Sequence, residues 1–62
     1  MKRKEKKQLA EKIAIYERII QSTDDEEKIK KAELKIMELS THVYNLEDMV
    51  EIDEMVQDLL AD

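Results

Sequence analysis

An apolar heptad repeat through the middle of the sequence constrains the fold more than any other feature. Apolar side chains recur there at alternating spacings of three and four residues, at Ile29, Ala32, Ile36, Leu39, Val43, Leu46 and Val50. We call these seven residues the heptad seam. Their spacing places them on one face of an α-helix, as in coiled coils and helical bundles. A shorter run with the same spacing precedes them, at Leu9, Ile13, Tyr16 and Ile20. The pattern predicts an all-α, coiled-coil-like fold.

The composition supports helices and excludes several ways of stabilising a small protein. The 62 residues include no Gly, Pro, Cys, Phe or Trp, and 44% of them are charged. Such a chain favours long helices over sheets and tight turns. The absence of cysteine excludes disulfides and thiolate metal sites. Because a chain this short buries only about 60% of its unfolded surface, we expect one helical domain, residues 1–62, that associates with another chain.

The first helix is expected at about residues 4–21 and the second at about residues 24–43. The apolar pattern is interrupted at residues 22–26, which read Ser-Thr-Asp-Asp-Glu. Thr23 is followed three residues later by Glu26, which is the pattern of a capping box with Thr23 as the N-cap. A connection this short, without Gly, predicts that the two helices lie antiparallel as a helical hairpin.

The apolar stripe changes phase after Leu46. Its next members lie three residues out of step with the heptad seam, at Met49, Ile52, Val56 and Leu59. A slip of three residues marks either a stammer in one helix or a break. Asn45 is a good N-cap, acidic residues follow it, and Tyr44 and Met49 have the spacing of a hydrophobic staple. These signals favour a third helix at about residues 46–60, and a long or bent second helix is the alternative.

The length of the C-terminal stripe predicts association. An unbroken helix over residues 24–61 would run about 57 Å, whereas a first helix of about 18 residues spans about 27 Å. The apolar residues of the segment 46–60 would then be bare, and such a stripe marks an interface. Either this segment folds back or another chain covers it. Both possibilities predict a homodimeric bundle or a complex with a partner.

Residues that carry catalysis or bind cofactors are nearly absent. Without Gly there is no phosphate-binding loop, and the single histidine, His42, has no nucleophile beside it. Glu38 and His42 share a helix face, but the dimetal sites of helical bundles use a different spacing in two copies. We therefore expect a structural histidine, no metal, no cofactor and no enzymatic activity. Three methionines are expected to fill the core: Met37, Met49 and Met55.

Charge is segregated along the sequence. Residues 1–20 carry seven basic and three acidic groups, whereas residues 46–62 carry seven acidic groups and no basic one. Both ends have the sign that a helix dipole disfavours there, which suggests an outside partner or attraction between the ends. No apolar run approaches the roughly 20 residues that cross a bilayer, and no signal-peptide region follows the basic start. A soluble, cytoplasmic protein without membrane contact is expected.

We expect the C-terminal segment to bind another protein. It combines a net acidic charge with the phase-shifted stripe, so its flanks would steer a basic surface towards an apolar face. The candidate binding residues are Met49, Glu51, Ile52, Glu54, Met55, Val56 and Leu59. The predicted function is that of a small, non-enzymatic regulatory module that pairs with itself or with another protein.

Nucleic-acid binding is the alternative function. Its candidate residues open the chain: Lys2, Arg3, Lys4, Lys6 and Lys7. With these cations, the expected dimeric hairpin resembles the plasmid-encoded Rop family in architecture and length. This resemblance implies contact with an RNA backbone through paired cationic helices. No aromatic residue is interleaved with the cations and the net charge is −5, which favours the protein-binding function.

Overall fold

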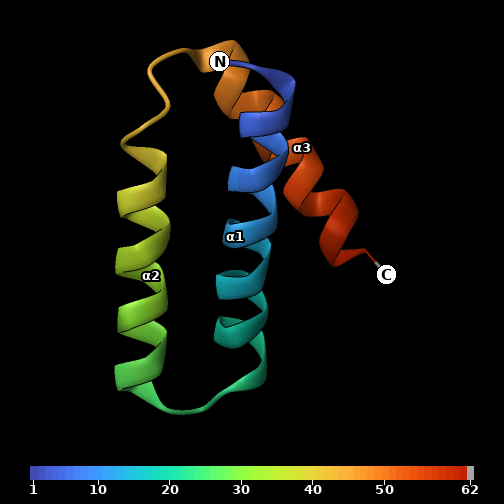
Figure 1. The fold of residues 1–62 in the computed structure, drawn as a ribbon. Coiled ribbons are helices and arrows are strands. Elements are labelled where there is room, and N and C mark those ends of the chain that lie inside the picture. Colours follow the sequence, from blue (N-terminus) through green and yellow to red (C-terminus); the bar gives the residue numbers. More distant parts are fainter. Residues whose placement is uncertain (62) are drawn as a thin grey trace.

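Three α-helices make up the fold within residues 1–61, the part of the chain that this computed structural model describes (Figure 1). They are α1 (Arg3–Ser22), α2 (Glu26–Ser40) and α3 (Leu46–Leu60). The same residues contain no β-strand, which confirms the all-α prediction. Within the described range, no helix combines the length and apolarity that crossing a bilayer requires.

α1 lies between the other two helices and packs against both of them (Figure 1). α2 runs back along α1, and α3 then runs in roughly the direction of α1 while diverging from α2. Two polar contacts fix this direction, because Lys6 near the start of α1 meets Asp48 at the start of α3, and Arg18 meets Leu59 near the two ends. α2 and α3 make few direct contacts with each other.

The core lies between α1 and α3. Ala10, Ile13 and Ala14 of α1 are buried there together with Ile52 and Val56 of α3. The two alanines follow each other at a spacing of four residues, so they form a small-residue face that lets the backbone of α3 approach closely. Six half-buried apolar residues surround this cluster: Leu9, Ile36, Leu39, Val43, Met55 and Leu60.

The junction of α1 and α2 differs from the predicted capping box. Asp25 is the N-cap of α2, and its side chain accepts a hydrogen bond from the Glu27 N–H at 3.0 Å. Thr23 instead ends α1, and its hydroxyl accepts a hydrogen bond from the Asp25 N–H at 3.2 Å. The prediction of Thr23 as the N-cap is therefore wrong. Asp caps helices at least as well as Thr, and the hydroxyl stabilises the turn before the cap.

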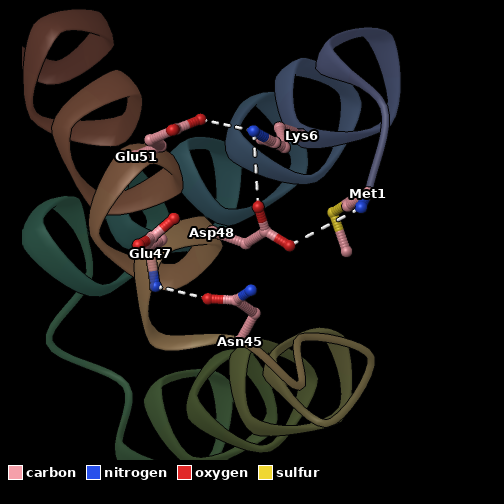
Figure 2. A network of polar contacts seen from close by, with 6 residues as sticks. All are labelled: Met1, Lys6, Asn45, Glu47, Asp48 and Glu51. Atoms are coloured by element: carbon pink, nitrogen blue, oxygen red, sulfur yellow. Dashed lines mark hydrogen bonds and ion pairs between the residues drawn. The ribbon is translucent and has the colours of Figure 1, made fainter.

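The junction of α2 and α3 confirms a third helix. α2 ends at Ser40, three residues before the predicted position, and residues 41–45 form a linker. The Asn45 side chain accepts a hydrogen bond from the Glu47 N–H at 2.8 Å, so the predicted N-cap of α3 is confirmed (Figure 2). At the other end of the linker, the Thr41 hydroxyl donates to the Glu38 carbonyl oxygen at 2.6 Å. This bond gives one of the last carbonyl groups of α2 a hydrogen-bond donor from outside the helix.

Three predictions about apolar side chains are wrong: the hydrophobic staple at Tyr44, and Met37 and Met49 as core residues. Tyr44 is 93% exposed, so it forms no hydrophobic staple with Met49. Met37 is exposed on α2 and does not fill the core. Of the other two methionines, Met55 packs against the core, whereas Met49 is largely exposed. A tyrosine tolerates exposure through its hydroxyl group.

Candidate protein-binding groove

An open groove of about 550 Å³ lies between α2 and α3. Its floor is the face of α1 that carries Ile13 and Glu17. One wall is formed by Ile36, Ser40 and Val43 at the end of α2 and in the linker. The other wall is α3, through Leu46, Met49, Val50, Ile52, Asp53, Glu54, Val56 and Gln57. The groove exists because α2 and α3 diverge and leave part of α1 uncovered.

Apolar side chains that the fold leaves uncovered concentrate on the α3 wall of the groove. Leu46 is 75% exposed, Val50 is 49% exposed, and Met49 is exposed to a similar degree. Scattered exposed apolar residues are normal on a protein surface, but these three lie within one turn and a half of one helix. Leu46 and Val50 are the last two members of the heptad seam, so the break after Ser40 separates them from the core. The groove is therefore an apolar surface without an intramolecular partner.

The charge around the groove has a single sign. Among the described residues that line it, all the charged ones are acidic: Glu17, Asp53 and Glu54. Glu17 lies on the floor, while Asp53 and Glu54 are exposed on α3. Such an arrangement attracts a basic surface at long range and disfavours an acidic one.

The predicted binding residues divide into two groups in the structure. Ile52 and Val56 are only 4% exposed, and Met55 packs beside them, so these three belong to the core with α1. Their assignment to an exposed binding surface is corrected, because α3 folds back and its most apolar face meets the small-residue face of α1. Met49 and Glu54 line the groove. Glu51 faces Lys6, and Leu59 is partly exposed outside the groove.

Sequence reasoning missed Leu46, Val50 and Asp53 as residues of the candidate site. Leu46 and Val50 fit the heptad seam so well that they were assigned to the same face as Ile36 and Leu39. The signal that they leave this face was the N-cap at Asn45, since a new helix starts with its own rotation about its axis. Asp53 lies one residue from Ile52 and therefore points to a different side of α3.

A charged network joins the start of α3 to α1 (Figure 2). The Lys6 ammonium group lies between the Asp48 and Glu51 carboxylates, 3.3 Å from Asp48 Oδ1 and hydrogen-bonded to Glu51 Oε2. The Met1 amino group lies 3.7 Å from Asp48 Oδ2. The hydrogen bond to Glu51, assisted by Asp48, raises the pKa of Lys6 above its usual value, although desolvation opposes the change. The acidic first turn of α3 thus has cations beside it.

The basic N-terminal residues do not act as one group. Lys2, Arg3, Lys4 and Lys7 are exposed, whereas Lys6 is engaged with α3. Arg3 is the first residue of α1, so nearly all of the basic segment is helical. Deletion of residues 1–7 would also remove Lys6 from its network with Asp48 and Glu51.

Glu38 and His42, the two residues with the spacing of possible metal ligands, do not form a metal site with other residues in the described part of the chain. Glu38 Oε2 lies 3.4 Å from Lys35 Nζ. His42 is exposed in the linker, where its backbone N–H donates to the Leu39 carbonyl oxygen at 3.3 Å. In the described part of the chain, no three His, Cys, Asp or Glu residues gather as metal ligands. No protein-family model, curated protein or solved structure matches this chain.

Proposed function

We propose that this protein is a non-enzymatic binding module that holds an amphipathic helix of another protein in the groove between α2 and α3. The observation that carries the proposal is the exposure of Leu46, Met49 and Val50 on one wall of a groove with an acidic border. Helices that lie in such grooves insert apolar residues at spacings of three and four, and their polar flanks face the border. The acidic border favours an occupant with Lys or Arg on its flanks.

The dimensions of the groove fit one helical segment. α2 and α3 have 15 residues each, and such helices are about 22 Å long. An occupant of the same length has four turns and presents three or four apolar side chains to the floor. Its apolar contacts with Val50, Met49 and Ile13 would supply most of the affinity, because they remove apolar surface from water. The carboxylates would mainly accelerate association and set specificity.

A regulatory role follows from this mode of binding. A module that covers the apolar face of a partner helix withholds this face from other contacts, and it needs no catalytic group to do so. Self-association, as a coiled-coil-like homodimeric bundle built on the helical hairpin of α1 and α2, is part of the proposal. The exposure of the seam residues Leu46 and Val50 supports it, because a monomer leaves them in contact with water.

Two synthetic peptides test the groove directly. One is a cationic amphipathic helix with Leu at positions i, i+3, i+4 and i+7 and Lys on its flanks, and the other replaces each Lys by Glu. We expect saturable binding of the cationic peptide, an association rate that falls with salt, and much weaker binding of the anionic peptide. Amide chemical shifts of the protein should change at Leu46, Val50 and Ile13.

Val50→Asp and Leu34→Asp form the matched pair of variants. Both replace an exposed aliphatic residue by a carboxylate, and Leu34 is 58% exposed on α2 and does not line the groove. Val50→Asp should abolish binding of the cationic peptide while the circular dichroism spectrum remains helical, and Leu34→Asp should leave the affinity unchanged. If both variants weaken binding equally, or if the anionic peptide binds as tightly, the groove is not the binding site.

A further inference from the structure

We propose that two copies of this chain pair by exchanging α3, with the linker 41–45 becoming helical so that α2 and α3 form one long helix in each copy. The partner is a second copy of the chain, and the surface that it covers includes the exposed end of the heptad seam. This proposal does not depend on peptide binding in the groove. It rests on the sequence of the linker, on its hydrogen bonds and on the way α3 is held.

The heptad seam passes through the linker without interruption. Ile36 and Leu39 in α2, Val43 in the linker, and Leu46 and Val50 in α3 keep spacings of three and four residues. In the single chain the seam residues after Val43 do not pack in the core, because Leu46 and Val50 are exposed. In a continuous helix, all of these side chains would lie on one stripe. The sequence is thus compatible with two arrangements of the same segment.

The start of the linker continues the last turn of α2. The Thr41 backbone has helical angles, with φ −66° and ψ −17°. Two further bonds continue the turn, from the His42 N–H to the Leu39 carbonyl oxygen at 3.3 Å and from the Val43 N–H to the Ser40 carbonyl oxygen at 3.0 Å. Asn45 is extended, with φ −119° and ψ 129°, and the linker contains no Gly or Pro. The backbone at Asn45 must therefore leave its extended conformation for the two helices to join.

α3 is held almost entirely by α1, and these contacts can form between two copies. Ile52 and Val56 pack on Ala10 and Ala14, and the ends of the helices are joined through Lys6 and Arg18. α3 makes few contacts with α2. When α3 leaves its own chain, nearly all the contacts that it loses are therefore contacts with α1, and α1 of a second copy can provide them. An exchanged pair restores every α1–α3 contact. In each such contact, α1 belongs to one copy and α3 to the other.

The direction of the helices allows this exchange with two-fold symmetry. α3 runs in the direction of α1, and α2 runs in the opposite direction. If α2 continues straight into α3, a second copy placed antiparallel presents its α1 beside this α3 in the observed direction. The two long helices then cross near the linker, where Tyr44, Leu46 and Val50 of both copies meet. These are exposed residues in the single chain, so the pairing gives them a partner.

Cross-linking between two chains that carry a single cysteine at different positions tests the exchange. Because the natural chain has no cysteine, one population carries Lys6→Cys and the other Glu51→Cys, and the two are mixed, unfolded, refolded together and treated with a short bismaleimide. Neither chain can cross-link within itself, so a covalent pair requires α3 of one copy on α1 of the other. We expect a covalent dimer, and no such product from Lys6→Cys mixed with Leu34→Cys. If light scattering shows a dimer but the Lys6→Cys and Glu51→Cys chains do not cross-link, pairing occurs without exchange and the proposal is wrong.

Variants at Asn45 and in the linker provide a test without cross-linking. Asn45→Ala removes the cap that only the single-chain form uses, and loss of one cap of about 1 kcal/mol shifts an equilibrium about fivefold. Because a pair contains two linkers, its dissociation constant should fall roughly 25-fold by analytical ultracentrifugation. Asn45→Asp keeps a good cap and should leave the constant unchanged. Insertion of Gly-Ser-Gly after Tyr44 should abolish pairing while α1–α3 packing persists in the monomer. The proposal would be overturned if the natural chain, the two Asn45 variants and the insertion variant had equal dimer content. It would also be overturned if all four were monomers at submillimolar concentration.

Discussion

Arg18 Nη2 donates a hydrogen bond of 2.8 Å to the carbonyl oxygen of Leu59, which joins the C-terminal half of α1 to the last turn of α3. The last carbonyl groups of a helix have no intrahelical partner and carry a partial negative charge. α3 has no basic residue in its own last turn, so Arg18 supplies a cation from the neighbouring helix. Together with Lys6 at the other end, this bond shows that the opposite charges of α1 and α3 attract each other within one chain.

Arg18→Met should loosen the end of α3 without unfolding the protein. Methionine preserves the long apolar stem and removes the hydrogen bond to the Leu59 carbonyl oxygen. We expect a loss of about 0.5–1 kcal/mol in the free energy of unfolding, measured with urea. Lys12→Met removes the same charge from another exposed position on α1 and should change the stability by less than about 0.5 kcal/mol. Equal losses in both variants would mean that net charge, rather than this bond, determines the effect.

Ile52→Ala should unfold most of the protein, whereas Val50→Ala should have little effect. Ile52 is buried against α1, and truncating a buried Ile to Ala costs about 2–5 kcal/mol. Small single-core domains rarely have more than about 3–5 kcal/mol in total. Val50 lies two residues earlier on the groove wall, so its truncation should cost less than about 0.5 kcal/mol. Thermal unfolding followed by circular dichroism gives both values, and the reverse order of effects would contradict the packing of α3 on α1.

Lys6→Met should lower the melting temperature at neutral pH, and the difference from the natural protein should disappear in alkali. Folding raises the pKa of Lys6, so the folded state holds this proton more tightly than the unfolded chain. The resulting stabilisation is complete below the ordinary lysine pKa, about 10.4, and is lost as the pH rises through the raised value. Lys4→Met, at an exposed position, serves as the control for charge.

The pH series distinguishes an ion pair from simple packing of the Lys6 side chain. If Lys6 stabilises α3 only through its methylene groups, the difference in melting temperature between Lys6→Met and the natural protein will not depend on pH. Glu51→Gln in the Lys6→Met background should then add its own full effect. With an ion pair, the second substitution adds little, because its partner is already gone.

Replacement of the exposed N-terminal cations tests the alternative function. The variant with Gln at positions 2, 3, 4 and 7 keeps Lys6 and should retain the helical spectrum of the natural protein. On the protein-binding proposal, neither chain binds an RNA hairpin or duplex DNA at physiological salt, as measured by fluorescence anisotropy. An affinity of the natural chain that falls steeply with salt and is lost in the variant would establish the Rop-like alternative.

The spacing of apolar residues predicted the helical class and much of the core. Ile13 belongs to the apolar stripe predicted for α1 and is buried, and the phase shift at Ile52 and Val56 correctly marked a separate helix. Asn45 identified the start of α3 because a side-chain cap depends on only three adjacent residues. Local signals of this kind can be read from sequence, since the atoms that interact are close along the chain.

The candidate site was harder to predict because it depends on how helices are rotated against each other. Leu46 belongs by spacing to the stripe of Ile36, yet five linker residues turn it away from that face. Conversely, Ile52 was expected on a binding surface because the spacing of Ala10 and Ala14 does not show which helix packs on them. The choice between Thr23 and Asp25 as the N-cap is similarly close in energy, as both side chains accept hydrogen bonds from nearby N–H groups.

The central position of α1 determines the order in which the helices assemble. α1 and α2 are joined by residues 23–25 only, whereas the contacts of α1 with α3 link residues 41 and 45 positions apart. Closing the longer loop costs more chain entropy, and contacts between distant residues form more slowly. We expect α1 and α2 to meet first and α3 to dock last, on the face that carries Ala10 and Ala14. During refolding, the time before this docking is when α3 is free to find α1 of another molecule.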